Sequence, residues 1–179
     1  MDNTRDAELA ALSTGGDAHA FERLVNRHYT TVYRLSYKWC GVKEDAEDIT
    51  QEVFVKVAGK LKRFGGKSSF KTWLYRITVN AAKDHIRKQA AKRTYEKTFA
   101  KEHAPGNPNP SQEAHVEAAR LMAAIGMLPD KQKAAVLLVF SEGLSHGEAA
   151  RVLGCPETTV SWRVFQARKK LRKHLGRES

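Results

Sequence analysis

Residues 145–171 read SHGEAARVLGCPETTVSWRVFQARKKL, and this stretch decides the fold of the C-terminal part of the chain. Ser145 and Glu148 have the S-x-x-E spacing of a capping box at a helix N-terminus, and Gly154 is placed to end that helix. Pro156 suits the first position of a second helix. Two short helices joined by a three-residue turn, the second rich in cations, indicate a helix-turn-helix, whose second helix enters the major groove of DNA.

The second helix of this motif has distinct buried and exposed sides. Val160, Val164, Ala167 and Leu171 recur at spacings of four, three and four, which predicts the buried side. The exposed residues are expected to reach base edges or phosphates. They are Thr158, Thr159, Ser161, Trp162, Arg163, Arg168 and Lys169. A purely structural helical hairpin is the alternative.

A basic, aromatic segment occupies residues 60–88, KLKRFGGKSSFKTWLYRITVNAAKDHIRK. A loop at Gly65-Gly66 leads into a helix expected to begin near Phe70, with cations on one narrow arc and apolar residues on the remainder. Cations neutralise phosphates, and aromatic rings stack on unpaired bases. The residues expected to contact nucleic acid are Lys62, Arg63, Lys67, Lys71, Trp73, Arg76, Asn80, Lys83 and Arg87. Core packing of Trp73 and an ordinary soluble surface for the cations are the alternatives.

An acidic segment occupies residues 44–52, EDAEDITQE. On a helix, Glu44, Asp48 and Glu52 fall at i, i+4 and i+8, and Glu47 and Gln51 lie beside them. Apolar residues take the opposite side, so the pattern predicts a carboxylate stripe backed by core. A plain solvated face is the alternative. No His lies at ligand spacing, so we expect no metal site here.

Amphipathic periodicity continues through the rest of the chain. Spacings of three and four recur over residues 21–35 and 46–61, and strand alternation is absent. The Pro-rich segment 103–112, HAPGNPNPSQ, reads as a linker. We therefore expect an all-α protein of two small helical domains, at 1–100 and 118–179, joined by a flexible linker at 101–117, with the helix-turn-helix in the C-terminal domain.

Charge is unevenly distributed along the 179 residues, whose net charge is +11. Residues 1–55 hold six Lys and Arg against ten Asp and Glu, whereas residues 56–101 hold fourteen against two. This contrast predicts two surfaces for two different partners, one of them a polyanion. The two cysteines form no CxxC pair, and no apolar run resembles a signal peptide or membrane span. These features indicate a soluble cytoplasmic protein.

Two long runs resemble extracytoplasmic-function (ECF) sigma factors of the sigma-70 family. AFERLVNRHYTTVYRLSYKWCGVKEDAEDITQEVFVKV followed by FKTWLYRITVNAAKDHIRK is similar to their region 2. LPDKQKAAVLLVFSEGLSHGEAARVLGCPETTVSWRVFQARKKLRKHL is similar to their region 4. Together the two runs cover most of residues 20–175. The resemblance implies a non-enzymatic subunit that binds core RNA polymerase and directs it to particular promoters.

The resemblance also implies roles for the three surfaces. Asp45, Glu47, Asp48, Gln51 and Glu52 match the region that docks on the clamp helices of the largest polymerase subunit. Residues 64–87 match the part that opens and reads the minus-ten element, and residues 157–170 match the reader of the minus-thirty-five element. The implied partners are core polymerase, through its clamp helices and flap, promoter DNA and an anti-sigma protein. No cofactor, metal, small-molecule substrate or membrane insertion is expected.

Trp162 and Val79 depart from the family pattern. The position of Trp162 usually holds a small or polar residue, and the indole either contacts a thymine methyl or packs on the preceding helix, of which we favour packing. Val79 stands where a basic or small residue is frequent, which weakens a DNA contact there.

Two other functions compete with this interpretation. A free-standing repressor or activator would use only the helix-turn-helix and bind a palindrome as a dimer. A Mg²⁺-dependent nuclease would use the carboxylates between Glu44 and Glu52, but no second acidic cluster completes a two-metal site.

Overall fold

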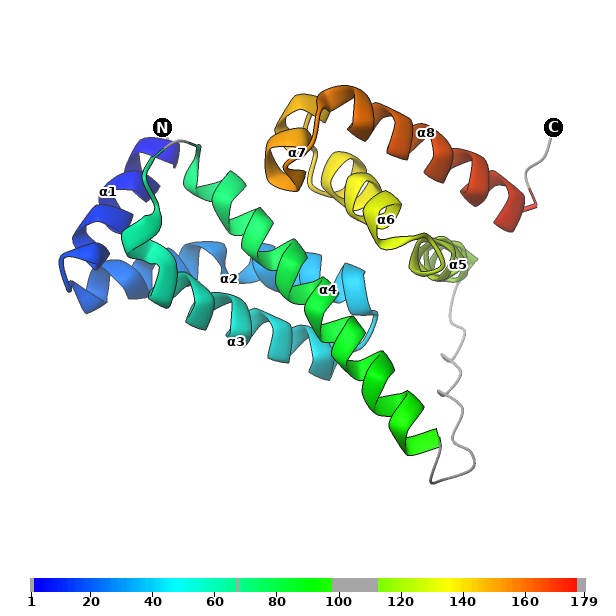
Figure 1. Ribbon diagram of the computed structural model, residues 1–179, viewed down its shortest axis with the longest axis horizontal. Coiled ribbons are helices and arrows are strands. Elements are labelled where there is room, and N and C mark those ends of the chain that lie inside the picture. The colour runs from blue at the N-terminus through cyan, green and yellow to red at the C-terminus, as the bar shows by residue number, and fades with distance from the viewer. Residues whose placement is uncertain (1, 67, 98–112, 177–179) are drawn as a thin grey trace.

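The computed structural model describes residues 2–66, 68–97 and 113–176, and all of its regular elements are helical (Figure 1). The N-terminal half contains α1 (Asp2–Thr14), α2 (Ala18–Cys40), α3 (Lys43–Lys60), the 3₁₀ turn η1 (Leu61–Arg63) and α4 (Phe70–Lys97). The C-terminal half contains α5 (Glu113–Gly126), α6 (Asp130–Val136), the π-helical segment η2 (Leu137–Ser141), α7 (His146–Leu153) and α8 (Glu157–His174). The all-α prediction is confirmed.

Helices α2, α3 and α4 form the body of the N-terminal half. Asp17 begins α2 by accepting a hydrogen bond from the Ala20 amide at 3.0 Å, and Gly41 ends it in the left-handed region that disfavours a Cβ. The apolar residues that recur along α2 and α3 are buried where the two helices meet. They include Leu24, Val32, Leu35, Ile49, Val53 and Val57. The periodicity seen in the sequence therefore predicted this core correctly.

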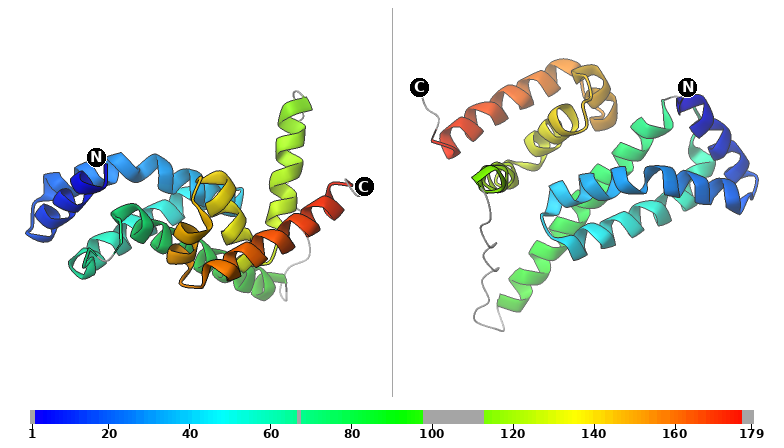
Figure 2. Two further views of the ribbon diagram at one scale, coloured as in Figure 1. Left: turned by 90° about the horizontal axis from the view of Figure 1, so that it is seen from above. Right: turned by 180° about the vertical axis from the view of Figure 1, so that it is seen from behind.

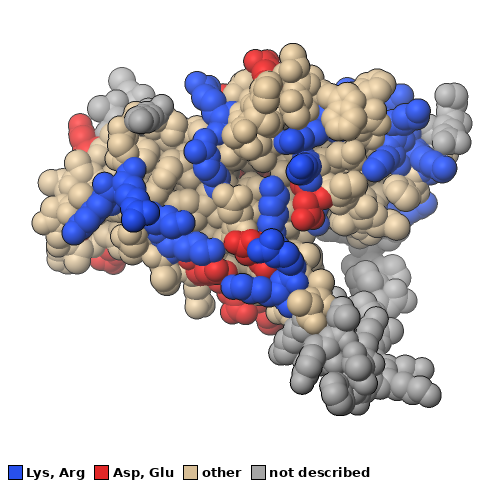
Figure 3. All heavy atoms as spheres, viewed as in Figure 1, with Lys and Arg blue, Asp and Glu red and all other residues tan. Residues whose placement is uncertain are grey.

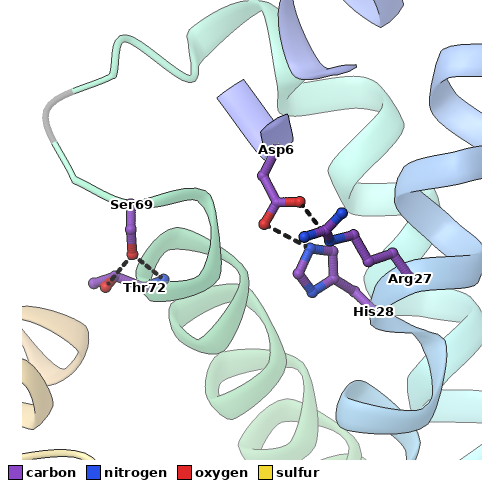
Figure 4. Close-up of polar contacts among 5 residues, drawn as sticks. All are labelled: Asp6, Arg27, His28, Ser69 and Thr72. Atoms are coloured by element: carbon purple, nitrogen blue, oxygen red, sulfur yellow. Dashed lines mark hydrogen bonds and ion pairs between the residues drawn. The ribbon is translucent and has the colours of Figure 1, made fainter. Parts of the chain in front are cut away.

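Helix α1 is tied to this body by a buried polar cluster (Figure 4). The Asp6 carboxylate lies 3.0 Å from the Arg27 guanidinium and 3.0 Å from the His28 ring. Burial lowers the pKa of His28 even though the neighbouring carboxylate favours its charged form. The cluster joins α1 to α2 through charged hydrogen bonds inside an otherwise apolar region.

The helix-turn-helix of the C-terminal half forms as predicted. Ser145 and Glu148 make a complete capping box at the start of α7, and Gly154 ends α7 with a φ of 62°. Val160, Val164 and Ala167 of α8 are buried, as their spacing predicted. Residues 98–112, most of the expected linker, lie outside the described residues, and α5 already begins at Glu113.

The two halves pack directly on one another. Helix α7 of the C-terminal half contacts α4, and α5 contacts α2, so the two halves lie side by side (Figures 1 and 2). Buried residues of both halves belong to one continuous apolar core. Among the described residues, no helix is long and apolar enough to cross a bilayer.

Candidate nucleic-acid and polymerase interfaces

The acidic residues of α3 lie along one exposed side of the helix, with the core on the other. Asp48 and Gln51 are exposed, whereas Asp45 hydrogen-bonds His85 of α4 at 2.9 Å. Glu52 lies 2.8 Å from Lys56, and this hydrogen bond lowers the pKa of Glu52. Glu47 lies 3.8 Å from the exposed Lys43. The stripe predicted from the sequence is thus present, but Asp45, Glu47 and Glu52 have partners within the chain.

The predicted cationic arc of α4 lines a groove of about 740 Å³. Five residues predicted to contact nucleic acid lie along it: Trp73, Arg76, Asn80, Lys83 and Arg87. Lys56 and Lys60 of α3 add further cations, and Ile77 and Ile86 supply apolar surface. Figure 3 shows Lys and Arg side chains spread over the face that carries α4 and α8. The groove is therefore cationic and partly apolar, as a strand of nucleic acid requires.

The cations of the groove differ in their surroundings. Arg87 is exposed and pairs with Asp84 at 3.0 Å, one turn earlier on the same helix. Lys83 is half-buried, and this burial lowers its pKa. Arg76 donates hydrogen bonds to the carbonyl oxygens of Arg151 and Val152, which belong to the C-terminal half. None of the three is sealed inside the protein.

Aromatic rings support the start of α4. Trp73 is half-buried, with its ring centroid 5.3 Å from that of Phe64 and 5.7 Å from that of Phe70. Ser69 begins the helix by accepting a hydrogen bond from the Thr72 amide at 3.1 Å (Figure 4). The indole therefore packs on one side and lines the groove on the other, and its contact with nucleic acid stays a prediction.

The remaining cations of this segment lie in η1, in the loop that follows it and in the first turn of α4. Lys62, Arg63 and Lys71 are exposed, and the Lys71 ammonium lies 5.7 Å from the Tyr75 ring. Lys67 lies outside the described residues. Val79 is buried, so it presents no surface to DNA.

The exposed side of α8 includes most of the residues predicted to contact DNA. Thr158, Arg168 and Lys169 are exposed, and Thr159 is partly so. Trp162 is 57% exposed, so the predicted packing of its indole on the preceding helix is largely absent.

Two residues of α8 point toward the protein. The Ser161 hydroxyl hydrogen-bonds the His146 ring at 2.8 Å and thereby joins α7 to α8. The Arg163 guanidinium donates to the Cys155 sulfur at 3.4 Å. Arg168 also has an internal contact, because its guanidinium lies 5.0 Å from the Phe140 ring centroid. In this conformation these side chains help to hold the motif together.

Both halves of the chain match profiles of known protein families. The family profile described as Sigma-70 region 2 matches residues 24–92, and the profile described as Sigma-70, region 4 matches residues 118–171. The ECF RNA polymerase sigma factor SigE of Mycolicibacterium smegmatis is 36% identical over 95% of this chain and 68% of its own length. SigM of Mycobacterium tuberculosis is 34% identical over 96% of this chain and 85% of its own.

A solved structure extends the likeness to the arrangement of the two halves. The structure of CnrH in complex with the cytosolic domain of CnrY superposes with a TM-score of 0.73 at 28% identity, covering 98% of this chain and 99% of that one. Both sigma-70 regions thus occur here in one chain, region 2 before region 4. The chain belongs to the ECF RNA polymerase sigma factors of the sigma-70 family.

Proposed function

We propose that the three surfaces divide the work of promoter recognition in a factor with no catalysis of its own. The stripe on α3 docks on the clamp helices of the largest polymerase subunit, the α4 groove holds the minus-ten element, and α8 reads the minus-thirty-five element. Domain bounds of 1–100 and 118–179, with the linker between them, follow from this division. The observation that carries the proposal is the groove, where cations, an amide and an indole share one side of α4.

The role of the α4 groove is tested by run-off transcription with core polymerase on a cognate promoter. Lys83 lines the groove, and the exposed Lys88 on the same helix does not. We expect Lys83→Ala to lower open-complex formation several-fold, because losing a phosphate contact reduces affinity at physiological salt. The matched change Lys88→Ala should leave it within twofold. Equal effects of the two variants would contradict the assignment.

The stripe on α3 is tested by affinity for core polymerase alone. Asp48→Lys reverses an exposed charge without breaking a described ion pair, and we expect it to weaken binding about tenfold through like-charge repulsion. Glu22→Lys is the control, since Glu22 is exposed on α2 outside the stripe. If both reversals weaken polymerase binding equally, the stripe has no special role.

We also propose that a protein of the anti-sigma kind controls this chain in the cytoplasm, where core polymerase is available. The likeness to CnrH, whose structure was solved with the cytosolic domain of CnrY, supports this. Affinity purification of the intact chain from its native cytosol tests the proposal. Recovery of core polymerase together with a second protein that competes with it is the expected result, and recovery of polymerase alone under every growth condition would contradict it.

A further inference from the structure

The interface between the halves is built on the ends of two helices. Arg76 of α4 donates through Nε to the Val152 carbonyl at 3.2 Å and through Nη2 to the Arg151 carbonyl, in the last turn of α7. In the opposite direction, Lys133 of α6 donates to the Trp39 carbonyl at 2.6 Å, in the last turn of α2. Carbonyls at a helix C-terminus lack intrahelical partners and carry partial negative charge, so they attract cations. Each half therefore caps a helix of the other.

Glu142 makes a third connection between the halves. Its carboxylate accepts a hydrogen bond from the Tyr75 hydroxyl at 3.0 Å and lies 3.4 Å from the Lys38 ammonium. The same ammonium donates to the Ser141 hydroxyl. Only 9% of the Glu142 side chain is exposed, so water screens these contacts weakly.

The π-helical segment η2 fixes the position of this carboxylate. The Glu142 amide donates to the Leu137 carbonyl at 3.0 Å, five residues earlier, in the pattern of a π-turn. Such segments are rare and frequently occur at functional sites. Here the wide turn positions Ser141 and Glu142 against Lys38 and Tyr75 of the N-terminal half.

This closed arrangement is incompatible with the proposed reading of both promoter elements at once. Their names place the elements about 25 base pairs apart, which is about 85 Å of duplex. In the closed arrangement, however, Arg76 of the minus-ten groove touches α7 of the helix-turn-helix directly. Asp130 of α6 also lines the groove, so a carboxylate occupies a place suited to phosphate. The two halves must separate before both elements can be bound.

We infer that Glu142 is the centre of a latch that holds the free factor closed, and that Arg76 exchanges helix carbonyls for DNA when the latch opens. This inference rests on the proposed function of the α4 groove. A partner that binds the closed form would strengthen the latch, and core polymerase would open it by binding the separated halves. The latch is a property of this chain alone, so it can be tested without either protein.

The variant Lys38→Glu distinguishes an effect of opening the latch from an effect of net charge on DNA binding. The change removes two units of positive charge, which by itself weakens DNA binding. It also sets two carboxylates against each other at the latch, which should open the chain. Because apparent affinity scales with the open fraction, we expect Lys38→Glu to bind a single-stranded oligonucleotide about tenfold more tightly than the natural chain, without polymerase. The double variant Lys38→Glu, Glu142→Lys should restore the original affinity.

A second comparison uses variants of equal charge. Glu142→Gln and the surface change Glu22→Gln alter the net charge identically, and only the first should raise oligonucleotide affinity. Small-angle X-ray scattering of the free natural chain should give a compact radius of gyration, and of Lys38→Glu a larger one. An extended natural chain, weaker binding by Lys38→Glu or equal affinities for the two Gln variants would overturn the latch. Failure of the proposed function would appear instead as absent transcription by the natural chain on every promoter tried.

Discussion

Replacing Lys133 with Met removes one of the two helix-end contacts between the halves while keeping most of the side-chain volume. The ammonium is held 2.6 Å from the Trp39 carbonyl and 5.4 Å from the centroid of the Trp39 ring. The residue is only 8% exposed, and this burial lowers the pKa of Lys133. The charged group therefore contributes attraction and a desolvation cost at the same site.

The net effect follows from these opposing contributions. Losing a charge-assisted hydrogen bond costs about 1.5–3 kcal/mol, and losing a cation–π contact costs about 0.5–2 kcal/mol. Met recovers part of this, because no charge is then buried and the aliphatic stem still packs. We expect Lys133→Met to lower the free energy of unfolding by about 1–2 kcal/mol.

Urea and thermal unfolding of the intact chain measure this difference. In a chain of this length each kcal/mol corresponds to about 2–4 °C in Tm. The exposed neighbour Lys131 supplies the control, since Lys131→Met should change stability by less than about 0.5 kcal/mol. A Lys133→Met variant as stable as its control would refute the reasoning, because it would mean that the cation contributes nothing to holding α6 against α2.

Three further predictions concern pH, capping and packing. Because burial lowers the pKa of His28, the unfolded chain binds a proton near pH 6.5 that the folded chain does not. The free energy of unfolding should therefore fall as the pH drops below 6.5. Urea melts at pH 5–7.5 should show this dependence in the natural chain and a flatter one in His28→Gln. Ser145→Ala should cost about 1 kcal/mol of stability, with reduced amide-exchange protection at the start of α7. Ile49→Ala, at a fully buried position, should cost about 2–5 kcal/mol in the same melts, whereas a cost below 1 kcal/mol would contradict the packing described for α3.

Local signals in the sequence were sufficient to predict the helices and which side of each helix is buried. The capping box at Ser145 and Glu148, the glycine after α7 and the spacing of Val160 and Val164 each act within a few residues, and each appears in the structure as expected. Helix α5 begins at Glu113, inside the expected linker at 101–117, and the bounds of that linker stay a prediction. Glu113 and Ala114 favour a helix, but the prolines just before them outweighed that signal.

The partners of individual side chains could not be predicted from periodicity. A helical wheel places Arg76 on a cationic arc but cannot show that its guanidinium meets the end of α7, about 75 residues later in the chain. Ser161 and Arg163 likewise lie on the expected side of α8 and yet turn toward His146 and Cys155. Lys38 and Glu142 carried no signal at all, because an isolated Lys and an isolated Glu are ordinary surface residues until tertiary packing brings them together.

Arg76 is inferred to hold helix carbonyls in the closed form and DNA in the open form, and both roles follow from the chemistry of its acceptors. Helix-end carbonyls and phosphate oxygens are both oxygen acceptors that suit a guanidinium, so one arginine is suited both to hold DNA and to hold the closed form. The two states then compete for one group, and the affinity for DNA is reduced by the fraction of chains that are closed. Salt should affect the closed form and the DNA-bound form differently. The contacts of Arg76 with helix carbonyls involve no condensed counterions, whereas DNA binding releases them. Raising the salt concentration should therefore weaken DNA binding far more than it opens the chain, and scattering and oligonucleotide titrations at 50 and 200 mM salt would show whether the two effects separate.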